Sequence, residues 1–256
     1  MGEASADDRA RWLVQACVEL ASPGDADVAA LLVERCGQLV PATDVSVAVV
    51  GEDGELEVAA CSSERMVAVA ACDVRSRRGP SPDCVRTGRP LLNVALDGPA
   101  RWPRYTPLAR AAGYGRVHVL PLRVGDRVTG ALCVCGAADH RLPDGEAELV
   151  QALADVAAAT LALRARLAAA TELADQLQTA LRSRVVIEQA KGVVAERLGL
   201  KVDEAFELMR GYARRHGARL AAVAADLVAK VLPATALSLR SDGERLAGRA
   251  SRGGGR

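Results

Sequence analysis

The chain has 256 residues, half of them apolar and 2% aromatic, and its formal net charge is +1 at pH 7. This length suffices for one domain with a sizeable core and a second, smaller domain. A net charge near zero argues against a protein that coats nucleic acid or anionic membranes through charge alone.

The N-terminal segment and the cysteine content indicate the compartment. The first ten residues, MGEASADDRA, are polar and acidic, and the longer apolar runs are interrupted by charges. Neither a secretory signal nor a membrane span is therefore expected. Seven cysteines, an odd number, are typical of a reducing compartment. We expect a cytoplasmic protein whose cysteines are mostly small, buried apolar residues.

Residues 8–165 predict an α+β domain with an antiparallel sheet. Apolar residues at helical spacing predict helices over 8–22, over 25–40 and through Met66 and Val69. Valine-rich segments predict two hairpins, with strands at 44–50 and 55–61 and at 115–124 and 127–135. Between the hairpins, residues 78–90 are rich in Pro and Gly and predict an irregular loop with a short turn.

This part of the chain resembles a GAF domain of the kind that precedes ANTAR domains in actinobacterial regulators. The resemblance rests on the strings SSERM, GPSPDCVRTGRP, RWPRY and VHVLPLRVGDRVTGALCV. GAF domains bind cyclic nucleotides, haem, flavins, bilins or nothing, so the resemblance leaves the cofactor unknown. A small-molecule ligand in this domain is one expectation.

Cys84 is a candidate redox-active thiol. A short helix that starts near Ser81 would place Cys84 close to the positive end of the helix dipole, and Arg86 and Arg89 would further lower the pKa of the thiol. The alternative is a half-buried cysteine without chemistry. Relatives often carry a Cys where this chain has Ser81, which argues against a pair of sensing thiols.

Three further residues of the expected hairpin favour structural roles. Cys133 and Cys135 are two apart on one strand and share a face, which favours core packing. A zinc site is not expected, because no His or further Cys follows at ligand spacing. His118 favours a sheet histidine over a haem ligand. The sequence contains no catalytic triad, phosphate-binding glycine loop or paired-carboxylate site, so we do not expect an enzyme.

Residues 146–182 predict a connecting helix. From 146 to 191 there is neither Gly nor Pro, and Ala and Leu dominate, which favours one continuous helix. A mostly apolar series of residues follows at alternating steps of four and three: Leu149, Leu153, Val156, Thr160, Leu163, Leu167, Ala170, Ala174, Leu177 and Leu181. This heptad seam predicts a coiled-coil homodimer, which small residues weaken in the middle. Alternatively, the first two heptads pack on the sheet of the first domain.

Residues 175–232 predict three short helices with a basic face. Apolar stripes run through Ile187 to Leu198, through Ala205 to Ala213 and through Leu220 to Val228. Lys201, Gly217 and Ala218 offer no capping side chain, so both junctions are expected to fray. The tail, 238–256, contains five Arg and a GGG run and is expected to be disordered.

The ordered pattern S-R-x-x-I-x-x-A-K-G, then D-E-A-F-x-L-x-R-x-x-A, then L-x-x-V-A-x-x-[LV]-V resembles the ANTAR domain of transcription antitermination regulators. The resemblance implies an RNA-binding domain that recognises paired hairpins, or tandem stem-loops, in nascent transcripts. The candidate RNA contacts are Arg184, Gln189, Lys191, Gly192, Arg210, Tyr212 and Arg214. The whole chain is thus predicted to join an α+β GAF sensor, through a long helix, to an all-α ANTAR domain.

Other functions stay open from the residues alone. Residues 175–230 hold ten Lys and Arg against seven Asp and Glu, so the basic face could be an ordinary solvated surface. A ligand- or redox-sensing interaction protein with a degenerate output domain is one alternative. A helix-turn-helix DNA-binding regulator is another, although the third helix, LAAVAADLVAK, offers almost no side chains that read bases.

Overall fold

The computed structural model describes residues 6–24, 26–51, 53–98 and 101–237. The chain divides into two compact units, residues 1–167 and 168–256. Within the described ranges, no helix has both the length and the apolar character needed to cross a bilayer. The predicted disordered tail, 238–256, lies outside the described residues.

A five-stranded antiparallel sheet forms the centre of the first unit, with strand order β2-β1-β5-β4-β3. The strands are β1 (Asp44–Val50), β2 (Leu56–Cys61), β3 (Leu91–Ala95), β4 (Arg116–Val124) and β5 (Arg127–Gly136). Both predicted hairpins are confirmed. Strand β3 was missed because it has five residues and is interrupted by Asn93, which has φ of 56° and produces an irregular register with β4.

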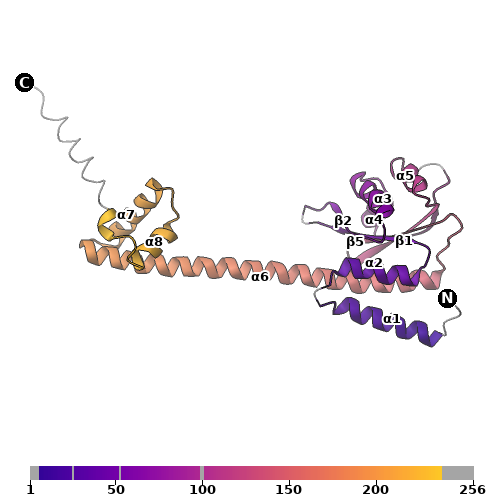
Figure 1. Cartoon of the computed structure of the whole chain (residues 1–256), viewed down its shortest axis with the longest axis horizontal. Coiled ribbons are helices and arrows are strands. Elements are labelled where there is room, and N and C mark those ends of the chain that lie inside the picture. The colour runs from indigo at the N-terminus through magenta and orange to yellow at the C-terminus, as the bar shows by residue number, and fades with distance from the viewer. Residues whose placement is uncertain (1–5, 25, 52, 99–100, 238–256) are drawn as a thin grey trace, which may run out of the picture. The chain divides into compact units, whose positions relative to one another are not determined.

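Helices cover both faces of this sheet (Figure 1). Helix α2 (Val28–Leu39) and the first part of α6 (Asp144–Leu198) cover one face, and α1 (Ala6–Ala21) packs outside them against α2. Helices α3 (Glu64–Arg75), α4 (Pro80–Thr87) and α5 (Tyr105–Ala111) cover the other face. Alternation along β4 supplies both cores, because Leu120 and Leu122 face the first set of helices while Val117 and Val119 face the second.

The irregular loop predicted at 78–90 is wrong over most of its length, whereas the short helix considered for Cys84, with a start near Ser81, is present as α4. Pro80 occupies the first turn of α4, where its missing N–H leaves no helical hydrogen bond unmade. Gly88 ends the helix with φ of 63°, a conformation that glycine adopts without strain. Pro and Gly thus mark the two ends of a helix here, rather than an irregular segment.

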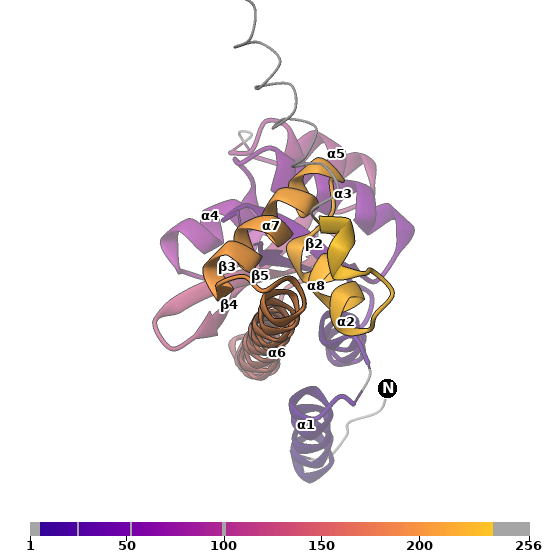
Figure 2. The same cartoon turned by 90° about the vertical axis from the view of Figure 1, so that its left-hand side faces the viewer.

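Helix α6 is continuous over 55 residues and ends at Leu198, before Gly199. It extends the predicted connecting helix and also supplies the first helix of the C-terminal bundle. The remainder of the second unit is α7 (Val202–Arg215), α8 (Leu220–Val228) and a 3-10 turn, η1 (Ala234–Leu237). Figure 2 shows α7 and α8 beside the C-terminal end of α6, and Ala190, Val194, Met209, Val223 and Leu227 are buried in their shared core.

The two weak helix starts of the bundle differ. The backbone N–H of Lys201 donates to the Glu204 carboxylate at 3.0 Å, so α7 has half of a capping box that the sequence analysis missed. At α8 the missing cap is confirmed, because Arg219 makes no side-chain capping hydrogen bond.

Candidate nucleic-acid interface

Lys191 lies at the junction of α6 and α7. Its side chain is only 16% exposed, and its ammonium group lies 5.4 Å from the centroid of the Phe206 ring. The same ammonium pairs with Glu188 at 2.9 Å. A cation over an aromatic face is attracted by the ring's quadrupole. Lys191 therefore links the two helices, and Glu188 offsets part of its charge.

Three exposed arginines lie along the same side of the bundle. Arg210 and Arg214 follow Phe206 at steps of four along α7, so they project from one side of that helix. Arg210 lies 3.7 Å from Glu207, whereas Arg214 has no ion pair with any described residue. Arg184 precedes Lys191 by two turns of α6 and is exposed. We call Arg184, Lys191, Arg210 and Arg214 the basic flank.

Tyr212 lies away from the basic flank. Two residues along a helix are about 200° apart, so Tyr212 points to nearly the opposite side of α7 from Arg210. Its ring stacks on His216, with centroids 4.0 Å apart and an interplanar angle of 22°. Gln189 precedes Lys191 by two residues on α6, so it points to nearly the opposite side of that helix, and it is exposed. Tyr212 and Gln189 therefore do not extend the basic flank.

Gly192 is exposed on α6, and a Cβ built on it would meet no atom within 4 Å. Glycine in a helix interior costs roughly 0.5–1 kcal/mol relative to alanine. Nothing in the described part of the chain requires glycine at this position.

The predicted heptad seam divides into a buried part and an exposed part. Leu153 and Thr160 are buried, and Leu149 and Val156 are half-buried, in the unit that contains the sheet. The alternative that the first heptads pack on the sheet is therefore confirmed. Further along, Leu163, Leu177 and Leu181 are 67%, 58% and 64% exposed.

Cys84 lies in α4 with its side chain fully buried. Its Sγ lies 3.9 Å from the carbonyl oxygen of Val119, and burial raises the pKa of the thiol to about 12. The predicted lowering of this pKa is wrong, because the thiol points into the core rather than toward the N-terminal dipole. Arg86 contacts Asp83 at 3.1 Å instead of assisting the thiol.

Asp73, which the sequence analysis missed, is a buried carboxyl group. Its Oδ2 accepts the backbone N–H of Ser81 at 3.1 Å, while Oδ1 has no partner among the described residues. Burial raises its pKa to about 7. The signal for Asp73 was present in the sequence, because it follows Met66 by seven residues and Val69 by four and so shares the buried stripe of α3.

His118 and the cysteine pair have the expected structural positions. The Nδ1 of His118 accepts the backbone N–H of Asn93 at 3.0 Å, and burial lowers the pKa of the imidazole to about 4. The expected position of His118 within the sheet is confirmed, but only one ring nitrogen is satisfied, because Nε2 is buried without a hydrogen-bond partner among the described residues. Cys133 and Cys135 are buried in the core with their sulfur atoms 3.8 Å apart.

Family comparisons agree with this architecture. The GAF domain model matches residues 9–162, and the ANTAR domain model matches residues 175–228. The chain is a GAF and ANTAR domain protein. No curated protein sequence matches it.

Solved GAF domains share the fold of the first unit. The GAF domain of an Acinetobacter phosphoenolpyruvate-protein phosphotransferase has a TM-score of 0.51 at 11% identity, and the match covers 62% of this chain and 95% of that one. The GAF domain of the corresponding Coxiella burnetii protein has a TM-score of 0.51 at 21% identity, with 64% of this chain and 99% of that one covered. At these identities the likeness shows the fold alone.

All seven predicted RNA contacts fall in the ANTAR domain, but the structure brings only some of them together. Four form the basic flank, and Gln189, Gly192 and Tyr212 lie off it. Sequence reasoning missed the acidic partners Glu188 and Glu207 and the stacked ring of His216. The signal for them was present, since each lies three or four residues from its partner on the same helix.

Proposed function

We propose that this GAF and ANTAR protein is an RNA-binding transcription antitermination regulator and not an enzyme. In this proposal it acts in the cytoplasm, binds paired hairpins in nascent mRNA, and is controlled by its GAF domain. The observation that carries the proposal is the basic flank of the ANTAR domain, where Arg210 and Arg214 are exposed one turn apart beside the Lys191–Phe206 contact.

The basic flank suits contact with folded RNA. Double-stranded RNA is recognised mostly by its shape, through phosphates and 2′-hydroxyl groups. Exposed guanidinium groups supply such phosphate contacts, and the affinity they give falls with salt. Arg214 is free of ion pairs among the described residues, and Arg210 has a long contact of 3.7 Å with Glu207. Both guanidinium groups can therefore contact phosphates without breaking a close ion pair.

The exposed leucines of α6 support a homodimer. A second copy would bury Leu163, Leu177 and Leu181 against their equivalents, and fully burying a leucine contributes about 1.5–3 kcal/mol. A dimer presents two ANTAR domains, which matches an RNA with two hairpins. A register change along this seam would let the GAF domain alter how the two domains are presented.

The alternative of a helix-turn-helix DNA-binding regulator gains no support from the composition of the third helix. The third helix of the bundle, α8, carries a single charged residue, Asp226, and its buried residues Val223, Ala224 and Leu227 belong to the core. Such a helix presents few groups to the base edges of a major groove.

The test is a salt titration of binding to an RNA with two adjacent stem-loops, compared with one stem-loop and with duplex DNA of equal length. We expect tighter binding to the tandem RNA, and weaker binding after Arg210→Gln or Arg214→Gln. Arg197→Gln is the matched control, because Arg197 is exposed on α6 but faces about 120° away from Lys191.

Two outcomes would contradict the proposal. The folded protein could fail to bind tandem stem-loops at low salt, which would leave a ligand-sensing interaction protein. It could also bind duplex DNA as tightly as RNA, which would favour a DNA-binding regulator.

A further inference from the structure

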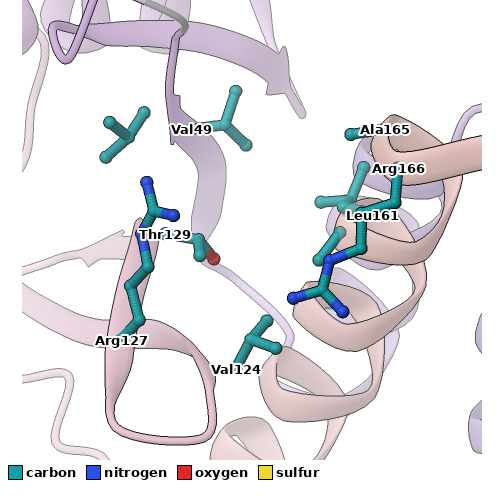
Figure 3. Close-up of a pocket in the computed structure, with 9 residues that line it drawn as sticks. Val49, Val124, Arg127, Thr129, Leu161, Ala165 and Arg166 are labelled. Carbon is teal, nitrogen blue, oxygen red and sulfur yellow. The ribbon is translucent and has the colours of Figure 1, made fainter. Parts of the chain in front are cut away.

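The first unit contains a pocket of about 480 Å³ at the ends of β1, β4 and β5, where the strands meet α6 (Figure 3). Its apolar wall is formed by Val49 and Val124 from the strands and by Leu161 from α6. All of its lining residues belong to the GAF domain unit. It lies on the α6 side of the sheet, away from the core that contains Cys84 and Tyr105.

Two arginines line this pocket from different elements. Arg127 rises from the start of β5, and Arg166 extends from α6 toward the strands (Figure 3). No lining residue is acidic, and neither guanidinium has an ion pair with a described residue. Thr129 also lines the pocket, and its hydroxyl donates to the carbonyl oxygen of Leu122 at 3.3 Å.

The size and lining of the pocket define a class of ligand. Small-molecule sites have volumes of about 300–1,000 Å³, with apolar walls and a few placed polar groups that fix orientation. Guanidinium groups match the geometry of a carboxylate in two parallel hydrogen bonds. A molecule that fits must therefore combine an apolar body with an anionic group.

We propose that this pocket binds a small organic carboxylate, with its apolar body against Val49, Val124 and Leu161 and its carboxylate held by Arg127 and Arg166. The ligand bridges the sheet and α6. Two of its contacts, Leu161 and Arg166, flank Leu163, the first strongly exposed leucine of the seam. Ligand binding thereby fixes α6 at the point where the helix ceases to be covered by its own domain.

The binding step is independent of RNA, whereas any effect on antitermination rests on the function proposed above. The experiment therefore measures binding to the full-length protein without RNA. Calorimetric titrations with octanoate, below its micelle concentration, are compared with titrations of octanamide, which has the same chain length and no charge. We expect octanoate to bind about tenfold more tightly than octanamide.

Variants assign the binding to this pocket. Arg127→Gln and Arg166→Gln should each weaken octanoate binding by about tenfold and leave octanamide binding unchanged. Ala165→Phe should fill the pocket and abolish binding of both. Arg110→Gln is the control, because Arg110 is exposed on α5, on the other face of the sheet. Thermal unfolding of each variant verifies that the fold is kept.

Three results would overturn the proposal. Equal affinity for octanoate and octanamide would remove the role of the arginines. Octanoate binding that survives both arginine variants and Ala165→Phe would place the ligand on the exposed leucines of α6. The absence of binding for every carboxylate from butyrate to decanoate would show that the pocket holds only solvent.

Discussion

The ammonium group of Lys191 lies 5.4 Å from the centre of the Phe206 ring, and this contact joins α6 to α7 in the ANTAR domain. Lys191 is mostly buried, so its hydrocarbon stem packs while its charge meets the ring and Glu188. A lysine that the sequence singles out as an RNA contact is therefore also part of the packing of the bundle.

Removal of either partner should loosen α7. We expect Lys191→Met and Phe206→Leu, alone and combined, to show a coupling of about 0.5–1 kcal/mol in a double-mutant cycle. The free energy of opening is measured from hydrogen exchange of the α7 amides in the full-length protein. Additive effects of the two substitutions would mean that the contact contributes nothing to stability.

Gly192→Ala should have opposite effects on stability and on binding. Alanine favours the helix by roughly 0.5–1 kcal/mol, and its methyl group meets no atom of the described chain. If RNA approaches the backbone at Gly192, the same methyl group lowers the affinity for tandem stem-loops. Hydrogen exchange of the α6 amides and RNA titration give the two readouts. Unchanged RNA affinity would remove Gly192 from the set of RNA contacts.

Leu177→Glu should convert a dimer to a monomer, because it places a charge within the apolar seam of α6. Sedimentation equilibrium measures the effect. Leu173→Glu is the matched control, since Leu173 is 56% exposed on the same helix but lies outside the four-and-three spacing of the seam. An equal effect of both substitutions, or a wild-type protein that is monomeric with and without RNA, would contradict the predicted seam.

Asp73 should make the stability of the GAF domain fall as the pH rises. Burial raises the pKa of this carboxyl from 3.8 to about 7 in the folded protein, so the unfolded chain releases the proton first. Its contribution is fully present below about pH 4 and is lost by about pH 7, a change of roughly 4 kcal/mol. Thermal unfolding between pH 4 and pH 8 measures this loss.

Asp73→Asn keeps an oxygen that can accept the Ser81 amide and removes the titrating proton. We expect this variant to lack most of the pH-dependent loss and to be more stable than the wild type at pH 8. Asp126→Asn, in the exposed turn between β4 and β5, is the control. An unchanged pH profile in Asp73→Asn would show that another group causes the loss.

Local patterns in the sequence were enough to predict both hairpins, the long helix and the helices of the ANTAR bundle. The reason is that apolar residues recur with the period of the strand or helix whose buried face they form. The patterns failed at α4, where Pro80 and Gly88 bound a helix instead of breaking one, and at β3, which is short and distorted at Asn93. Pro and Gly can mark either the ends of a helix or an irregular segment, and which of the two forms depends on how the neighbouring elements pack.

By itself the sequence determined which residues carry charge and which positions along α6 share an apolar stripe. Only the tertiary structure decided how each is used. It buried Cys84 and raised the pKa of its thiol, divided the leucine stripe at Leu163, and placed Lys191 of α6 over the ring of Phe206 in α7. The physical reason is that burial, and therefore desolvation, depends on which faces of separate elements meet, and residue spacing within one element does not contain that information.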